Sequence, residues 1–410
     1  MMKSTNRLMG ASLAALMLVS APRIFAQDWP QWRGPERNGK VSGFTAPETW
    51  PKELTLKWKV TVGAGDSTPA LVGDKLYVFS RQGDDEVTTC IAAADGKTLW
   101  ENKYAAAPVT GPAARHPGPR GSPAVAEGKV VTLGATGVLS CLDAASGKEL
   151  WRKDEFPGVV PKFFTGMSPI VADGMAIAYL GGPGNGAVMA FDATSGKLKW
   201  KWGAEGPDYG SPVLMTVGGV KQLVTLTEKS LVGIGLADGK LLWQAPFPIH
   251  GMAYNAATPI VEGNTVIYTG QGRGTKAVKI EKQGEGFAAK ELWSNPEVSV
   301  QFNTPVLKEG LIFGLSDKGM FFCLDAKTGK TDWIDTIKRG GNFAAILDAG
   351  SIILAMPSTS ELIAFKPSDK DYAELARIKV AETATYAHPV IAGNRVFVKD
   401  QDTLAMWTIE

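Results

Sequence analysis

One phrase of eleven residues returns five times along this chain. Aligned on its Gly, and without gaps, it reads CIAAADGKTLW (90–100), CLDAASGKELW (141–151), AFDATSGKLKW (190–200), GIGLADGKLLW (233–243) and CLDAKTGKTDW (323–333). Lys follows the Gly every time, and Trp stands four residues after it. A catalytic motif rarely needs several copies, whereas a structural unit stacked many times does. The phrase therefore indicates a repeat architecture.

Each phrase belongs to a longer unit that opens with a hydroxyl residue or His before Pro. These openings are Thr68-Pro69, Ser122-Pro123, Ser168-Pro169, Ser211-Pro212, Thr258-Pro259, Thr304-Pro305 and His388-Pro389, with a degenerate copy at 343–346. The first five gaps between successive prolines are 54, 46, 43, 47 and 46 residues. Periods near 45 with β-type sequence are typical of propeller blades. The count of openings predicts eight blades.

The units are β throughout. After each opening come short runs split by Gly and Asp turns, such as PAVAEGK, KVVTLGA and GVLSCLDA, and a fourth run carries the Trp. Runs of this length and spacing predict strands and hairpins, and four strands make one blade. The last unit ends early, at 404–410, while 54–62 carries Trp58 directly before the first opening. We predict an all-β, eight-bladed propeller of four-stranded blades, closed by this N-terminal strand, since closure removes exposed edges.

The repeated tryptophans are predicted to lie between neighbouring blades, where each would bury a large apolar area. They are Trp58, Trp100, Trp151, Trp200, Trp243, Trp293 and Trp333. The position six before the repeat Gly holds only small residues: Cys90, Cys141, Ala190, Gly233 and Cys323. The three cysteines of the chain are thus expected to pack as small hydrophobes. No CxxC pair exists, so no metal site is predicted from them.

The first 26 residues are interpreted as a secretory signal. Lys3 and Arg7 precede the apolar run 11–20, and a cleavage site is predicted after Ala26. The run is short for a bilayer span, although a membrane anchor stays open as an alternative. No Cys lies near the cleavage site, so no lipoprotein is expected, and no later segment is predicted to span. We expect export to the periplasm or beyond, a leader at 27–53, and the propeller at 54–410.

Charge argues against nucleic acid as a partner. Removing the signal takes away three basic residues and no acidic one, so 43 basic residues become 40 against 41 acidic ones. Nucleic-acid binding needs a basic face, and no long Lys/Arg run exists.

For the oligomeric state of the protein, we expect a monomer.

The pattern A-x-D-x-x-[ST]-G-x-x-x-W resembles the tryptophan-docking repeat of the pyrroloquinoline-quinone (PQQ) propeller family. Blades two, three and six match it nearly in full, blades one and four lack the Asp, and blade five keeps only KELW (290–293). The resemblance covers roughly 54–410. The leader DWPQWRGPERNG (28–39) also resembles a segment found before exported PQQ-like propellers. The family contains dehydrogenases that hold PQQ and Ca²⁺, and scaffolds of the BamB type that help to assemble outer-membrane β-barrels.

The resemblance fixes the fold but leaves the function open. The large quinoprotein dehydrogenases carry an adjacent Cys-Cys pair and long insertions with Ca²⁺ ligands, and this chain has neither. Ca²⁺ needs several converging oxygens, and Asp84-Asp85, the acidic pair that stands out, is interpreted as a hairpin turn. We therefore predict no catalytic residue and no cofactor. A PQQ- and Ca²⁺-dependent dehydrogenase with a reduced site remains the alternative, as does a polysaccharide- or peptide-binding accessory protein.

The segments that join successive blades are the least repetitive and the most polar and aromatic part of the chain. They cross one face of a propeller toward its axis, so we expect a ligand or partner there. The candidates are Arg115, His116, Arg120, Tyr209, His250, Tyr254, Asn255, Phe302, Asn303, Asn342, Tyr386 and His388. They predict a mildly basic, aromatic funnel for an envelope protein, a peptide or a small anionic ligand. The simpler interpretation is a water-filled funnel lining. The leader is expected to pack across a face or the rim of the propeller. Recruitment of a partner protein is the alternative role for the leader.

Overall fold

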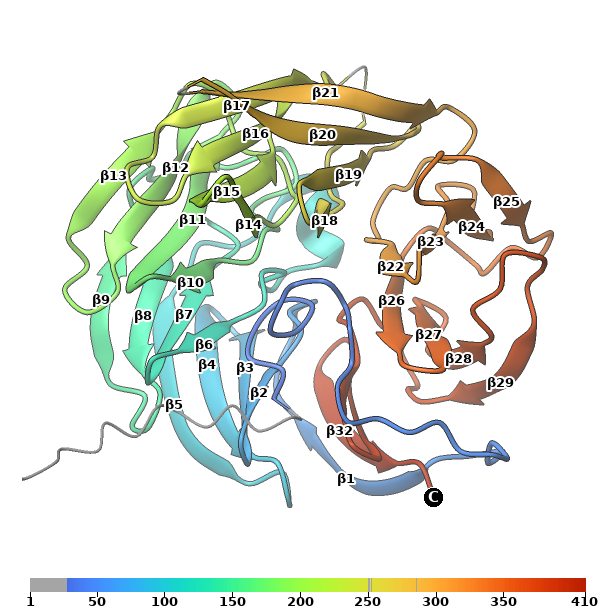
Figure 1. Ribbon diagram of the computed structural model, residues 1–410. Coiled ribbons are helices and arrows are strands. Elements are labelled where there is room, and N and C mark those ends of the chain that lie inside the picture. The colour runs from blue at the N-terminus through green and yellow to red at the C-terminus, as the bar shows by residue number, and fades with distance from the viewer. Residues whose placement is uncertain (1–27, 250, 252, 285) are drawn as a thin grey trace, which may run out of the picture.

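The computed structural model describes residues 28–249, 251, 253–284 and 286–410. The predicted signal and His250 lie outside these residues. The described part is a ring of four-stranded antiparallel sheets, eight in number, with a short 3₁₀ helix η1 (Gly111–Arg115) between the first two (Figure 1). The predicted eight-bladed, all-β propeller is thus confirmed.

The blades follow one another along the chain. Blades one to four are β2 (Ala70–Val72), β3 (Lys75–Gln82), β4 (Asp85–Ala92), β5 (Thr98–Ala105); β6 (Ala124–Ala126), β7 (Lys129–Leu133), β8 (Leu139–Asp143), β9 (Glu149–Lys153); β10 (Ile170–Ala172), β11 (Met175–Gly182), β12 (Asn185–Asp192), β13 (Leu198–Trp202); and β14 (Val213–Val217), β15 (Val220–Leu226), β16 (Ser230–Gly235), β17 (Leu241–Pro246). Blades five to eight are β18 (Ile260–Glu262), β19 (Thr265–Thr269), β20 (Thr275–Gln283), β21 (Gly286–Asn295); β22 (Val306–Lys308), β23 (Leu311–Leu315), β24 (Phe321–Asp325), β25 (Thr331–Ile334); β26 (Ala344–Ala349), β27 (Ile352–Pro357), β28 (Glu361–Phe365), β29 (Glu374–Lys379); and β30 (Val390–Ala392), β31 (Arg395–Lys399), β32 (Thr403–Thr408), completed by β1 (Thr55–Thr61).

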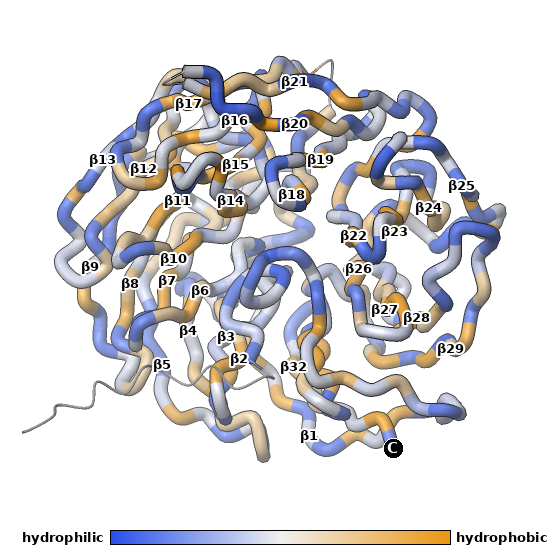
Figure 2. Tube along the Cα trace, viewed as in Figure 1, coloured by the Kyte–Doolittle hydropathy of each residue, from blue (hydrophilic) through white to orange (hydrophobic). Residues whose placement is uncertain are grey.

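The two ends of the propeller meet in the last blade. β1 pairs antiparallel with β32, from Thr55 opposite Thr408 to Thr61 opposite Thr403. The predicted closure by the N-terminal strand is therefore confirmed, and the last blade draws strands from both ends of the chain. Figure 2 shows apolar stretches along the strands and polar turns at their ends, as expected when sheets pack face to face around a ring.

The tryptophans lie across the seams between blades. The indole of Trp100 in blade one lies against Gly147 in blade two, where an added Cβ would be 2.4 Å from its Cε3, and its Nε1–H donates to the Ala144 carbonyl at 3.3 Å. The same glycine contact and indole bond join Trp58 to Gly96 and Ala93, Trp151 to Gly196 and Ala193, Trp200 to Gly239 and Leu236, and Trp293 to Gly329 and Ala326. One phrase therefore builds five of the seams.

Two repeat tryptophans find other partners. Trp243 Nε1–H donates to Gln222 Oε1 in its own blade at 2.5 Å, and Trp333 Nε1–H donates to the Ser368 carbonyl of blade seven at 2.8 Å. Blade five has no Gly-Lys turn in the repeat position, which is why Trp243 lacks the usual partner.

The pairing register explains why the position six before the Gly stays small. In the five blades that carry the phrase, this residue stands directly opposite the Trp of its own blade, as Cys90 does with Trp100 and Gly233 with Trp243. A Cβ on Gly233 would lie 2.1 Å from Trp243 Nε1. Cys90, Cys141 and Cys323 are free thiols with no exposed area. Burial raises the pKa of Cys90 to about 11, so this thiol stays protonated and unreactive at neutral pH. This agrees with the packing role predicted for the cysteines.

The hydroxyls of the blade openings link neighbouring blades around the axis. The opening Ser or Thr accepts a hydrogen bond from the backbone N–H of the equivalent residue in the blade before it. Five such bonds are present: Thr68 to Ser122, Ser122 to Ser168, Ser168 to Ser211, Thr258 to Thr304, and His388 to Thr68. A hydroxyl is required because the buried N–H would otherwise lack a partner.

The leader enters the centre of the ring, deeper than the predicted packing across a face or rim. Asp28 accepts from the Gly73 N–H at the β2–β3 turn, and Trp29 exchanges backbone bonds with Leu71. Arg33 donates to the Thr304 and Pro305 carbonyls of blade six at 2.9 Å, and Arg37 donates to two carbonyls of blade three at 3.1 Å. In Figure 1 the leader is the dark blue loop near the middle of the ring. The leader therefore plugs the channel from the face opposite the blade connections.

Among the described residues, no helix is long and apolar enough to cross a membrane.

Candidate functional site

A cavity of about 290 Å³ opens on the face formed by the blade connections. Its wall contains one residue from every blade: the residue three before the opening proline. These residues are Asp66, Arg120, Gly166, Tyr209, Ala256, Phe302 and Tyr386, with Phe343 three before Ile346 in the degenerate copy. The hydroxyls of the Ser and Thr openings link five pairs of neighbouring connections near the axis, and the position three residues before the opening lines the same cavity in every blade. We call this cavity the funnel.

Aromatic rings form one continuous side of the funnel. Phe302 stacks on Phe343 with ring centroids 4.2 Å apart, and also on Tyr254 at 5.8 Å. Phe163 meets Tyr254 edge-on at 5.2 Å, and Tyr209 meets Tyr254 edge-on at 5.8 Å. Stacked and edge-to-face pairs of this kind hold their members in fixed orientations. The connections into blades three to seven thus present a rigid aromatic wall.

The opposite side of the funnel is charged. A 2.7 Å contact joins His116 Nδ1 to Asp66 Oδ2, and the His116 ring packs edge-on against Tyr386 at 4.7 Å. Arg120 donates to the Phe163 carbonyl at 2.6 Å and to the His116 carbonyl at 3.1 Å. Burial lowers the pKa of Arg120, and the nearby Asp66 charge opposes that shift. The funnel wall therefore carries one cation and one carboxylate besides the histidines.

The leader supplies the floor of the funnel. The Trp32 indole N–H donates to Thr258 Oγ1 at 2.9 Å, and its ring packs on His388 with centroids 4.5 Å apart. Burial, together with the positive charge of Arg33, holds the pKa of His388 well below its ordinary value. His388 is therefore neutral at physiological pH. Because Trp32 and Arg33 close the channel from below, the funnel is a blind cavity.

A buried polar cluster behind the aromatic wall positions its two tyrosines. Asp208 accepts a hydrogen bond from the Asn255 N–H, and the Asn255 carbonyl accepts from the N–H groups of Tyr209 and Gly210. Arg273 donates to Asn255 Oδ1 at 2.7 Å and to the Tyr254 carbonyl at 3.0 Å. Burial raises the pKa of Asp208 to about 7, although the Asn255 N–H and the charge of Arg273 oppose the shift.

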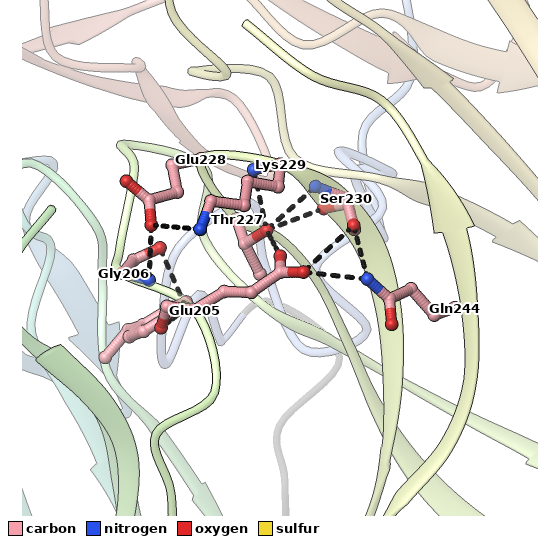
Figure 3. Close-up of polar contacts among 8 residues, drawn as sticks. Glu205, Gly206, Thr227, Glu228, Lys229, Ser230 and Gln244 are labelled. Atoms are coloured by element: carbon pink, nitrogen blue, oxygen red, sulfur yellow. Dashed lines mark hydrogen bonds and ion pairs between the residues drawn. The ribbon is translucent and has the colours of Figure 1, made fainter. Parts of the chain in front are cut away.

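A second network fixes the connection that carries Asp208. Figure 3 shows Glu205 between the β15–β16 hairpin and β17. Its carboxylate accepts from Thr227 Oγ1, from Ser230 Oγ at 3.2 Å and from Gln244 Nε2 at 2.7 Å. The Glu228 carboxylate accepts from the Gly206 N–H at 3.1 Å. These bonds hold the chain before Tyr209 against a neighbouring hairpin, so the tyrosine is placed by contacts far from the funnel itself.

The structure brings most of the predicted site residues together. Eight line the funnel: His116, Arg120, Tyr209, Tyr254, Phe302, Asn303, Tyr386 and His388. Three do not. Arg115 is exposed at the end of η1, Asn255 is fully buried behind Tyr254, and Asn342 donates to the Gln301 side chain. His250 lies outside the described residues. With Arg115 away from the cavity, Arg120 is the one Lys or Arg side chain of the lining among the described residues, and the expected basic character rests on it.

Sequence reasoning missed Asp66, Phe163, Phe343 and Trp32 as lining residues. Asp66 occupies the position three before Pro69, the same column as Arg120, Tyr209, Phe302 and Tyr386. A comparison of the position three before the opening proline in all eight units would have identified Asp66. Phe163 lies in an ordinary blade connection, six before Pro169, and no column marks it. Trp32 reaches the funnel only because the leader enters the channel, which no local pattern reveals.

The funnel residues do not fit PQQ with Ca²⁺. PQQ carries three carboxylates, whereas the funnel offers one guanidinium, already bonded to two backbone carbonyls. Ca²⁺ requires several converging oxygens. Asp66 is the one carboxylate of the lining and contacts His116, and the described residues contain no group of three His, Cys, Asp or Glu side chains suited to a metal.

Comparison with known proteins agrees with the fold. The outer membrane protein assembly factor BamB of Burkholderia pseudomallei is 26% identical over 358 residues, covering 84% of this chain and 85% of that protein. The crystal structure of BamB from Moraxella catarrhalis superposes with a TM-score of 0.64 at 13% identity, over 87% of this chain and all of that chain. The quinohemoprotein alcohol dehydrogenase of Comamonas testosteroni superposes with a TM-score of 0.70 at 14% identity, over 94% of this chain and 81% of that one.

Fold and funnel together define the class: an eight-bladed β-propeller of tryptophan-docking, PQQ-like repeats. Residues 83–335 match the family model described as "Outer membrane protein assembly factor BamB". The chain belongs to this family.

Proposed function

We propose that this protein is an exported, non-catalytic scaffold that binds a protein partner of the cell envelope through the blade connections around the funnel. The single observation that supports this most is the convergence of one residue from each of the eight blades on one rigid face. A rigid face of this kind can bind the surface of a partner protein without rearranging. The BamB relatives, named as outer-membrane protein assembly factors, favour a role in assembling such proteins.

The rim of this face is suited to a macromolecule. Arg115 is exposed on η1, within the longest blade connection, 106–123. Loops held on a rigid scaffold are the usual sites of recognition. The misfit of the funnel residues to PQQ and Ca²⁺ favours the scaffold over the dehydrogenase alternative.

Site-specific photo-crosslinking in the host envelope tests this proposal. A benzoylphenylalanine at position 115 lies on the funnel face, whereas one at Lys197, in the β12–β13 turn, lies on the opposite face. We expect the residue at 115, and not that at 197, to crosslink to a component of the β-barrel assembly machinery. Equal labelling from both positions, or none from 115, would contradict the proposal.

A further inference from the structure

Inside the rim, the funnel is a small cavity with an aromatic wall and unpartnered hydroxyl groups. We propose that it is a binding site for a neutral saccharide, one or two sugar rings at the end of a glycan chain, seated above Trp32. This site would act in addition to the partner-binding rim and does not depend on it.

The size and shape of the funnel restrict its ligand. Its volume of about 290 Å³ lies at the lower limit of small-molecule sites. Trp32 closes its floor, and Arg33 and Arg37 hold the leader there by bonds to the Thr304, Pro305, Ser168 and Pro169 carbonyls. An extended chain therefore cannot thread through the ring. A ligand must enter by its end, and only about one or two rings of it fit.

The aromatic wall requires a ligand with an apolar face. Phe163, Tyr209, Tyr254, Phe302 and Phe343 pack edge-on or face-on in one chain of contacts. Since these rings fix one another, the wall exists before any ligand arrives, and little side-chain ordering opposes binding. The C–H faces of a pyranose pack well against such rings.

The rest of the lining requires a ligand rich in hydroxyl groups. The phenol oxygens of Tyr254 and Tyr386 have no hydrogen-bond partner within the described part of the chain, and both residues are half-buried. The Ser168 and Ser211 hydroxyls each accept one backbone N–H, which leaves each hydroxyl proton free to donate. Asp66 adds a carboxylate acceptor. Sugar hydroxyls both donate and accept, so they can match all of these groups.

The charge balance favours a neutral ligand. Arg120 and Asp66 supply one positive and one negative charge on the same side of the funnel, and burial keeps His388 neutral. A planar anion would find one guanidinium, already bonded to two backbone carbonyls, and a carboxylate close to it. An apolar side chain would bury the phenols of Tyr254 and Tyr386 without partners, at a cost of about 1–3 kcal/mol for each unsatisfied group. A saccharide avoids both penalties.

Calorimetric titration of the purified mature protein with maltotriose, cellotriose and chitotriose tests the inference. We expect at least one trisaccharide to bind with a Kd below about 1 mM. The variants Phe302→Ala, which opens the aromatic wall, and Asp66→Asn, which removes the carboxylate, should each weaken that binding at least about tenfold. Phe287→Ala on the β20–β21 hairpin is the matched control, because Phe287 is half-buried and lies outside the funnel, and it should leave the Kd unchanged.

Three results would overturn the inference. The first is no heat from any of the trisaccharides at about 10 mM. The second is saccharide binding that survives Phe302→Ala and Asp66→Asn while thermal melts show both variants folded. The third is tighter binding of the blocked peptide Ala-Trp-Ala, lost in Phe302→Ala, which would make the funnel a peptide site. Crosslinking from position 115 in the Phe302→Ala variant reports on the rim separately, so the two proposals can fail independently.

Discussion

The two faces of this propeller differ in how far their sequences repeat from blade to blade. On the face away from the funnel, one phrase is repeated almost without change, and each copy places the Gly of one blade under the Trp of the blade before it. On the funnel face the blade connections differ in length and sequence, and only the Ser/Thr-Pro openings return. The repeated Trp–Gly contacts hold neighbouring blades together. Because these contacts do not involve the blade connections, the connections can vary in sequence without loss of the fold.

The leader links the two faces. It enters beside the β2–β3 turn, reaches the funnel floor at Trp32, and then contacts blades six and three through Arg33 and Arg37. The same segment continues into β1, which completes the last blade. Closure of the ring and closure of the funnel floor thus depend on one stretch of chain.

Removing residues 27–62 should have the largest effect, because it takes away both closures. The last blade would lose its outer strand, and β32 would become an exposed edge. We expect the melting temperature of the mature protein to fall by more than about 10 °C, since each 1 kcal/mol costs a chain of this kind a few degrees. Differential scanning calorimetry measures it. An unchanged melt would show that the ring does not need its N-terminal strand.

Gly147→Ala should break a seam, and blade two provides its matched control. Gly147 and Gly128 both have left-handed φ values, 73° and 72°. A Cβ on Gly147 would meet the Trp100 ring at 2.4 Å, whereas nothing lies within 4 Å of one on Gly128. Gly128→Ala should cost about 1–2 kcal/mol for the backbone alone, and Gly147→Ala about 2 kcal/mol more from overpacking. Equal losses of unfolding free energy would mean that the Trp contact adds nothing to the seam.

Predicting the repetitive face from sequence was straightforward, and the reason lies in its locality. The Gly, the Lys and the Trp of each phrase stand within five residues, and a Cys, Ala or Gly stands opposite the Trp in the preceding strand of the same hairpin. A contact made within one unit and copied into the next leaves a column in the sequence. Spacing alone therefore gave the eight blades, their four strands and the closing strand.

The funnel was harder to predict because its contacts cross between units that do not repeat. Phe302 stacks on Phe343 from the next connection, and His116 contacts Asp66, which lies fifty residues earlier. Arg33 and Arg37 of the leader are buried at 1% and 3% exposure, and their side chains donate to backbone carbonyls of distant blades. Such pairings follow from the ring geometry and leave no period in the sequence.

Arg33→Met tests whether the leader is fastened by its guanidinium or by burial. Burial lowers the pKa of Arg33 to about 9, which still leaves the group charged at neutral pH. Met keeps much of the apolar volume but leaves the Thr304 and Pro305 carbonyls unpaired, so we expect a loss of about 2–3 kcal/mol in unfolding free energy. Denaturant melts measure it, with Arg115→Met on the exposed rim as control. Equal stability of the two variants would assign the fastening to burial alone.

The smallest expected effect concerns the polar cluster behind the aromatic wall, and it appears as a pH dependence. Burial raises the folded-state pKa of Asp208 to about 7, whereas the unfolded chain releases the same proton near 4. The folded state binds the extra proton between these values, so this group makes the protein less stable as the pH rises from about 4 to 7. Asp208→Asn keeps an acceptor for the Asn255 N–H and cannot ionise. The variant should therefore gain about 2 kcal/mol relative to the parent protein between pH 5 and 7. Parallel stability curves for the two proteins across that range would show that folding does not raise the pKa of Asp208, and that the Asn255 N–H and the charge of Arg273 offset its burial.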